Sequence, residues 1–296
     1  MRFYPSSNKL QPKVLIGNCT CSYENVLNSI KNSEYEFKQL LHQPHDFIVI
    51  DTQQKLITCN LNNSISVYDL NDFKETSTVT KLNGKEIAPV SITNSESYIY
   101  MCDPSNDRIY QTDFNLNLHK QLDSNNRNNT ISDSKTFGNP IYIYYHKTKV
   151  YVCDHKNKQI KVLSDTLVFL KSHDLPFEPK KIKIVNKTAV ITQTYPESVI
   201  SIYNLEPNFN LKQIIENSHA NAIWSLKIPQ FIAFDADRKM FLFYNEDGSV
   251  AEEINYKTGR LKFKDETNNS EANIEIFVVK NQLFMTSSKS KELLII

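Results

Sequence analysis

Residues 149–160 read KVYVCDHKNKQI, and residues 98–109 read YIYMCDPSNDRI. Each stretch contains an apolar run that ends in Cys-Asp, then a polar turn with Asn, then an apolar residue seven positions after the cysteine. Short β-branched or aromatic runs on both sides of a polar turn are typical of a β-hairpin. These two hairpins are the clearest copies of a unit that recurs along the chain.

The recurring unit can be followed through almost the whole sequence from one anchor position on its second predicted strand. The anchors are Cys59, Cys102, Cys153, Thr192, Phe234 and Thr286. Thirteen residues before each anchor, another apolar run opens at Asp46, Pro89, Pro140, Pro179, Asn221 and Asn273. The mean spacing of the anchors is about 45 residues, which matches the length of one four-stranded propeller blade.

The repeat predicts an all-β fold, a six-bladed β-propeller of four-stranded antiparallel blades. The last copy stops at residues 293–296, which complete only its third strand, whereas a strand-like segment at residues 35–41 precedes the first copy. We expect this segment to complete the last blade, because a closed ring leaves no free sheet edge. The expected organisation is an N-terminal extension at residues 1–34 and a propeller at residues 35–296.

Composition and charge limit the classes of partner. The 296 residues are 40% hydrophobic, and 34 Lys and Arg against 33 Asp and Glu give a net charge of +1. Such a balance provides no overall field toward nucleic acid or an anionic membrane. No window approaches the ~18 apolar residues of a spanning helix, and the first residues lack a secretory signal. We expect a cytoplasmic monomer that does not associate with membranes.

The second and third copies resemble the NHL-repeat family. The resemblance is carried by Tyr-Val-Cys-Asp at 151–154 with Asn157 and Ile160, and by Tyr-Met-Cys-Asp at 100–103. It implies a propeller like those of tripartite-motif-type proteins, here without their RING and B-box modules, for which residues 1–34 are too short. Because the fourth and sixth copies have Gln193 and Ser287 in place of the Asp, a WD-like or generic six-bladed propeller remains the alternative.

The main functional prediction is a non-catalytic interaction platform that binds a protein or peptide ligand through its loops. A stiff ring that presents loops suits this role. The sequence contains only five glycines, and it has neither a Gly-rich phosphate-binding fingerprint nor a Gly-x-Ser-x-Gly nucleophile elbow. We therefore expect no enzyme activity and no cofactor.

A first alternative is RNA binding on a basic face of the third and fourth blades. Between Lys147 and Lys187 there are ten lysines against four acidic residues. The family resemblance also points this way, since some NHL propellers of tripartite-motif proteins bind RNA on a basic face with interleaved aromatic residues. The candidate residues are Tyr144, Lys147, Lys149, His155, Lys156 and Lys158.

A second alternative is a metal-dependent enzyme. The resemblance extends to lactonase-like and amidating-lyase-like propellers, which hold a metal in the central channel. The matching positions are Asp46, Asn221 and Asn273, whose oxygen atoms would suit Ca²⁺. No second acidic residue is expected to join Asp46 from another blade, which weakens this alternative.

Two further repeat positions are interpreted structurally. Cys59, Cys102 and Cys153 lie in different blades, too far apart for a disulfide. Because the sequence indicates no oxidising compartment, all five cysteines are expected to be free thiols. Asp103, Asp154 and Asp235 each stand just before the hairpin turn of their copy. We expect each to cap its own turn through an Asx hydrogen bond.

Overall fold

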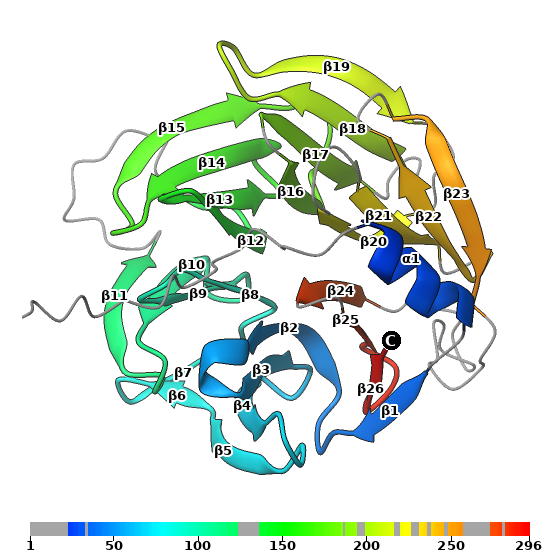
Figure 1. Cartoon of the computed structure of the whole chain (residues 1–296). Helices are drawn as coiled ribbons and strands as arrows, with labels where there is room; N and C mark the ends of the chain where they lie inside the picture. Colours follow the sequence, from blue (N-terminus) through cyan, green and yellow to red (C-terminus); the bar gives the residue numbers. More distant parts are fainter. Residues whose placement is uncertain are drawn as a thin grey trace, which may run out of the picture.

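Six four-stranded antiparallel sheets surround a common axis (Figure 1). The computed structural model describes residues 23–32, 35–123, 136–185, 187–193, 199–215, 220–225, 231–235, 238–245, 248–256, 273–279 and 282–296. The prediction of an all-β six-bladed propeller is confirmed. In the part of the chain so described, no helix is long and apolar enough to cross a membrane.

Each blade is numbered here by its order in the sequence, and its strands are given from the axis outward. Blade 1 has β2 (Pro44–Ile50), β3 (Lys55–Asn60), β4 (Ser64–Asp69) and β5 (Glu75–Val79). Blade 2 has β8 (Ser91–Asn94), β9 (Ile99–Asp103), β10 (Arg108–Thr112) and β11 (Leu118–Asp123). Blade 3 has β12 (Pro140–His146), β13 (Lys149–Asp154), β14 (Gln159–Ser164) and β15 (Phe169–Asp174).

The remaining blades follow the same order. Blade 4 has β16 (Lys181–Val185), β17 (Thr188–Gln193), β18 (Val199–Asn204) and β19 (Asn210–Ile215). Blade 5 has β20 (Ala220–Ser225), β21 (Phe231–Asp235), β22 (Met240–Tyr244) and β23 (Val250–Asn255). Blade 6 has β24 (Ile274–Val279), β25 (Gln282–Ser287), β26 (Glu292–Ile295) and, as its outermost strand, β1 (Glu36–Gln39).

Three smaller elements complete the described chain. They are α1 (Tyr23–Asn32), the 3₁₀ turn η1 (Asp51–Gln53) and a small hairpin formed by β6 (Lys81–Leu82) and β7 (Lys85–Glu86). The two hairpin residues Asn83 and Gly84 have φ of 48° and 76°. Positive φ at both central residues is what a tight two-residue hairpin requires, and Asn-Gly supplies it at low steric cost.

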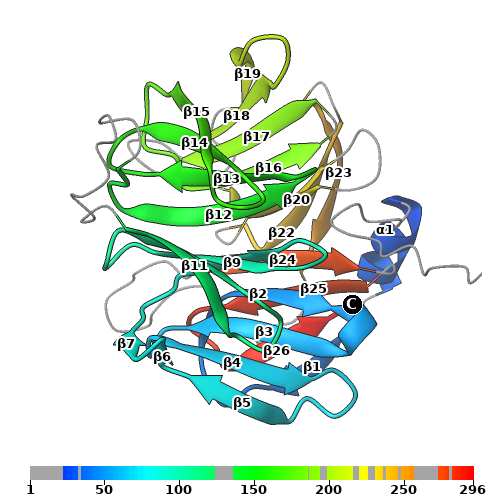
Figure 2. The same cartoon turned by 90° about the vertical axis from the view of Figure 1, so that its left-hand side faces the viewer.

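The turns of every blade alternate between the two faces of the ring, because consecutive strands run antiparallel. We call one face the entry face; it carries the connections between blades and the turns between second and third strands. The opposite face, here the far face, carries the turns between first and second strands and between third and fourth strands. Figure 2 shows the ring turned by 90°.

The ring is closed by strands from the two ends of the chain. β1 pairs with β26 in antiparallel register from Glu36↔Ile295 to Gln39↔Glu292. Leu40 N extends the ladder by donating to Lys291 O at 2.6 Å. The predicted completion of the last blade by residues 35–41 is therefore confirmed, and β26 gains a partner on its outer edge.

The helix α1 lies against blades 5 and 6 (Figure 2). It buries Val26, Leu27 and Ile30 in the same cluster as Phe234 and Met285. The spacing of these three residues places them on one face of the helix, and burial of such side chains contributes about 1.5–3 kcal/mol each. The segment 23–32 of the N-terminal extension thus packs on the propeller.

The six anchors occupy one structural position. Each is the second-last residue of the second strand of its blade, and each is at most 1% exposed. Cys59, Cys102 and Cys153 are free thiols, as expected, and burial raises their pKa well above the usual value. Cys19 and Cys21 lie outside the described residues.

The aspartates before the hairpin turns do more than cap them. Asp103 and Asp235 accept hydrogen bonds from the backbone N of Asn106 (3.1 Å) and Arg238 (2.9 Å) in their own turns, as expected. Asp103 also accepts from Ala88 N at 3.0 Å. In blade 3, Asp154 forms a fully buried ion pair with Lys161 at 2.7 Å. Asp103 therefore fastens the connection that enters blade 2 to the hairpin of that blade.

Deletion of residues 1–41 is expected to increase oligomer size or make the protein insoluble. The deletion removes β1 and exposes the outer edge of β26, which can then pair with another chain. Size-exclusion chromatography with light scattering at two protein concentrations measures the outcome. Deletion of residues 1–22, which removes no described residue, is the control. A 1–41 deletion that keeps the oligomeric state and Tm of the full chain would contradict this role of β1.

Candidate functional site

Side chains of the first strands form two layers around the axis of the ring. The first axial layer consists of the residues that pair with the anchors of blades 1, 2, 3, 4 and 6, namely Asp46, Ser91, Tyr142, Lys181 and Glu275; the equivalent backbone position in blade 5 is Ala222. The second axial layer lies two positions further along the same strands: Ile48, Thr93, Tyr144, Lys183, Trp224 and Phe277. Residues two apart on a strand share one side of it, so each blade contributes one position to each layer.

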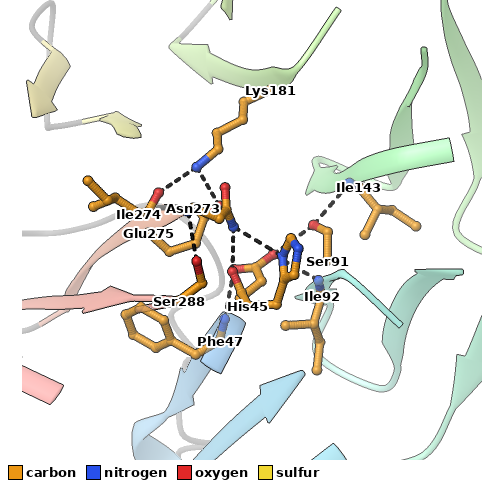
Figure 3. Close-up of polar contacts among 11 residues, drawn as sticks. His45, Phe47, Ser91, Ile92, Ile143, Lys181, Asn273, Ile274, Glu275 and Ser288 are labelled. Carbon is orange, nitrogen blue, oxygen red and sulfur yellow. Dashed lines mark hydrogen bonds and ion pairs between the residues drawn. The ribbon is translucent and has the colours of Figure 1, made fainter. Parts of the chain in front are cut away.

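Asp46 links blade 1 to blade 2 in the first axial layer. Its Oδ2 atom accepts hydrogen bonds from Ser91 Oγ at 2.7 Å and Ile92 N at 2.9 Å, and its Oδ1 atom accepts from Phe47 N at 2.7 Å. Ser91 Oγ in turn accepts from Ile143 N of blade 3 at 3.3 Å. Figure 3 shows Ser91 between Ile92 and Ile143. One buried carboxylate thus connects three consecutive blades.

Lys181 links blade 4 to blade 6 through a buried ion pair with Glu275 (2.5 Å) and a hydrogen bond to Ile274 O (Figure 3). Asn273 extends this connection to blade 1, because its Nδ2 atom donates to His45 O. The sequence-based expectation that no acidic residue joins Asp46 from another blade is wrong. Glu275 of blade 6 is a member of the same layer and acts electrostatically on Asp46.

Lys183 lies in a cage of aromatic rings in the second axial layer. Its ammonium is 4.2 Å from the ring centre of Trp224, 4.7 Å from that of Tyr144 and 5.3 Å from that of Tyr142. Attraction between a cation and ring faces at these distances stabilises a desolvated ammonium. Lys183 therefore connects blade 4 with the blades on both of its sides.

Burial shifts the ionisation of both axial layers. Burial, followed by repulsion from Glu275, raises the pKa of Asp46 to about 7. Burial lowers the pKa of Lys183 to about 8, although Glu275 and Asp46 act in the opposite direction. Burial also lowers the pKa of His45. In each case the dominant cause is the cost of holding a charge away from water.

The predicted metal ligands do not form a matched set. Asp46 belongs to the first axial layer, whereas Asn273 and Asn221 precede Glu275 and Ala222, which hold the equivalent positions of blades 6 and 5. Asn273 bonds to His45, and the side chain of Asn221 is outside the described part. Within the described ranges, no group of three or more His, Cys, Asp or Glu side chains is arranged to hold a metal ion.

The predicted RNA-binding residues are divided among three places. Lys147 and Lys149 are at the turn between β12 and β13 on the far face, and Tyr144 is buried in the lysine cage. His155, Lys156 and Lys158 lie in the turn between β13 and β14 on the entry face. The two turns are separated by the length of β13, about 17 Å. The structure does not bring these residues together on one surface.

A basic cleft opens between blades 3 and 4. It encloses about 140 Å³ and is lined by His146, Lys147, Lys149, Tyr151, Lys171, His173, Lys187, Leu205 and Glu206. Four of these residues are lysines, and Glu206, which pairs with Lys187 at 3.8 Å, is the one acidic residue among them. Of the sequence candidates, Lys147 and Lys149 belong to this cleft. The sequence did not single out the other lining residues, which come from β12 and β13 (His146, Tyr151), from β15 (Lys171, His173) and from blade 4 (Lys187, Leu205, Glu206).

Two histidines of the basic cleft are neutral at physiological pH. Burial, together with Lys147, lowers the pKa of His146 to about 4, and burial together with Lys171 lowers that of His173 to about 4. His173 stacks on Phe209 with ring centres 4.1 Å apart. The Nε2 atom of His146 is buried and has no hydrogen-bond partner. The lining of the cleft therefore includes four lysines and a histidine with one unpaired ring nitrogen.

Comparison with known proteins identifies the fold. No family model and no curated protein sequence matches this chain. Streptogramin B lyase is similar in structure, with a TM-score of 0.60, 13% identity, and coverage of 88% of this chain and 97% of that one. The propeller domain of Cps50 (Swd1) from Myceliophteria thermophila gives a TM-score of 0.55 at 7% identity, covering 88% and 99%. A KlHsv2 variant with loop 6CD replaced by a Gly-Ser linker gives 0.53 at 10% identity, covering 82% and 75%.

One of these neighbours is an enzyme by name, so the shared architecture assigns no activity to this chain. The family resemblance seen in the hairpins of blades 2 and 3 is confirmed only at the level of a six-bladed propeller. Function has to be argued from the axial layers and the basic cleft.

Replacement of Asp46 by Asn is expected to change how stability depends on pH. With its raised pKa, Asp46 keeps a proton in the folded state that the unfolded chain releases above about pH 4. The free energy of unfolding of the wild type therefore falls as pH rises from about 4 to about 7, by up to ~1.4 kcal/mol per unit. Asp46→Asn has no carboxyl proton to release, so its free energy of unfolding should not show this fall. In urea unfolding, the stability of the variant should therefore rise relative to that of the wild type between pH 5 and 7.5. A constant difference over that range would contradict the assignment.

Trp224 is the single tryptophan of the chain and should report the ionisation of Lys183. Loss of the proton from Lys183 removes the cation above the indole ring, so the emission of Trp224 is expected to change with a midpoint near pH 8. Lys183→Met should abolish this change, and Lys156→Met on the entry face should preserve it. A fluorescence titration of the three proteins makes the measurement. An unchanged titration in Lys183→Met would contradict the cage.

Proposed function

We propose that this chain is a non-catalytic interaction platform that binds an acidic segment of a protein partner on the far face of blades 3 and 4. Within this proposal the chain is placed with NHL-like propellers, on the strength of the hairpins of blades 2 and 3. The observation that carries the proposal is the basic cleft, because its four lysines face a single carboxylate.

The axial layers support a binding role over a catalytic one. Lys181 and Glu275 are 1% and 2% exposed and neutralise each other. Both carboxylate oxygens of Asp46 accept hydrogen bonds from neighbouring groups. A substrate or metal at this point of the axis would have to displace these contacts. The polar groups that a channel enzyme would use are here used to hold the blades together.

Apolar residues on the same face indicate the character of the partner. The outer strands of blades 3, 4 and 5 carry an exposed apolar side chain at their first or second residue, namely Leu170 (48%), Leu211 (46%) and Val250 (47%). Single exposed apolar residues are common on protein surfaces. Here the same end of the outer strand carries one in three consecutive blades, two of which form the basic cleft. A partner segment that combines carboxylates with apolar side chains complements this surface.

The contacts favour a protein ligand over RNA. Recognition of single-stranded RNA depends on aromatic side chains that can stack with bases. Tyr144 lies buried against Lys183, and Tyr151 of the basic cleft is also buried. The cleft contains lysine and no arginine, and lysine acts as a point charge rather than as a reader of base edges. RNA binding is retained as an outcome of the test.

Selection from a library of random displayed peptides tests the proposal. The wild type is expected to enrich acidic peptides with apolar residues, and Lys171→Glu/Lys187→Glu should weaken their binding at least tenfold, measured by fluorescence anisotropy. Both lysines are exposed, so stability should change by less than about 0.5 kcal/mol per site. Lys156→Glu/Lys158→Glu reverses the same charge on the entry face and should bind like the wild type.

Two results would contradict the proposal. One is peptide binding that the cleft variant leaves unchanged. The other is sequence-discriminating RNA binding at nanomolar Kd in physiological salt that the cleft variant abolishes. A gel-shift series with random and structured RNAs at two salt concentrations measures the second result, because binding to phosphates weakens steeply as salt increases.

A further inference from the structure

We propose that the basic cleft between blades 3 and 4 is a binding site for a phosphate monoester, carried by a phosphorylated side chain of the partner segment. This inference rests on the proposed function, since the phosphate is taken to belong to a segment that lies on the far face. The proposal specifies which chemical group of the ligand binds in the cleft and how the ligand is oriented. The group enters the cleft, and the rest of the segment stays outside.

Charge is the first argument for a phosphate group. Lys147 and Lys149 come from the first hairpin of blade 3, Lys171 from its outer strand, and Lys187 from the first hairpin of blade 4. Lysines from three separate elements thus line one small volume. A phosphate monoester carries a charge near −2 at neutral pH and three acceptor oxygens. Several lysines that act as point charges are a better match for a phosphate group than for a single carboxylate of a ligand.

Size is the second argument. The cleft volume of about 140 Å³ is well below the ~300–1,000 Å³ of pockets that enclose a whole small ligand. At roughly 30 Å³ per water molecule, it holds the equivalent of about five waters. This space accommodates a tetrahedral phosphate with its ester oxygen and first carbon. It is too small for a nucleotide or a large cofactor, so the remainder of the ligand must lie on the surface.

The third argument is the unused nitrogen of His146. Its Nε2 atom is buried without a partner, whereas most buried polar atoms in proteins are hydrogen-bonded. A neutral imidazole with its proton on Nε2 can donate to a phosphate oxygen. The other uncharged groups of the cleft are His173, which stacks on Phe209, and Tyr151. His146 lines the cleft, so a rotation of its imidazole that brings Nε2 to the cleft would let a bound phosphate satisfy an atom that the folded chain leaves unpaired.

Binding is measured with the full chain and two matched peptide libraries. One library has phosphoserine at a fixed position between randomised residues, and the other has serine there. The phosphoserine library is expected to bind at least tenfold more tightly. His146→Leu should reduce the logarithm of the ratio of the two affinities by at least half. His146→Gln, which keeps an N–H donor, should restore part of this ratio. Lys156→Glu/Lys158→Glu should leave it unchanged.

Inorganic phosphate and N-acetyl-O-phosphoserine methylamide separate the two sources of the anion. Both are expected to shift the His146 imidazole signals in NMR spectra, and the phosphoserine library should compete with both. If inorganic phosphate binds but phosphorylation of the library adds no affinity, the site belongs to a free anion and the proposal is wrong. Equal binding of both libraries without any His146 shift refutes the phosphate site but leaves the peptide platform intact. Absence of all peptide binding refutes the platform itself.

Discussion

The pairing of Lys181 with Glu275 is the contact on which the centre of this propeller depends. Six first strands converge on one axis, and three of them, β2, β16 and β24, carry ionisable side chains that water hardly reaches: Asp46, Lys181, Lys183 and Glu275. An unpaired charge in such a place costs several kcal/mol, and loss of one partner of a buried pair costs about 3–5 kcal/mol. Because Lys181 and Glu275 belong to different blades, their contact forms only when those blades hold their positions. A displaced blade would leave one charge unpaired, so the contact discriminates against displaced arrangements.

The shifted pKa values at the axis follow from the same burial. Perturbed ionisation is often the mark of an active site, but structural ion-pair networks cause it as well. Asp46 and Lys183 are shifted mainly by burial, and Glu275 influences both. Ser91, Tyr144 and Trp224 fill the remaining positions around them with hydrogen bonds and ring faces. The polar side chains at the axis thus bond to other residues of the chain itself.

The fold could be predicted because its signals are local and repeated. Anchors such as Cys59 and Thr286 mark the same point of every second strand, and the unmatched segments at the two ends indicated how the ring closes. The axial layers could not be predicted from spacing. Four residues separate the paired Ile50 and Lys55 in the first turn of blade 1, but only two separate Val185 and Thr188 in blade 4. A constant spacing of thirteen therefore equated Asp46 with Asn273, whereas its structural equivalent is Glu275. Residues two apart on a strand point to the same side. Glu275 lies two residues after Asn273, and Lys183 lies two residues after Lys181, so this spacing would have been the signal for both.

The lysine-rich stretch from Lys147 to Lys187 shows why charge along a sequence does not locate a site. Three of its ten lysines are buried in ion pairs or against rings: Lys161, Lys181 and Lys183. The turn between β13 and β14 carries Lys156 and Lys158 to the entry face, because an antiparallel hairpin places its successive turns at opposite ends. Only Lys147, Lys149, Lys171 and Lys187 converge, and they do so in a groove between two blades. Blades diverge from a common axis, so a groove of this kind widens toward the rim, where long polar side chains can line it without losing contact with water. The same radial geometry that forces charges together and pairs them at the centre thus places the outer lysines in a cleft with a single carboxylate, where an anion from another molecule can reach them.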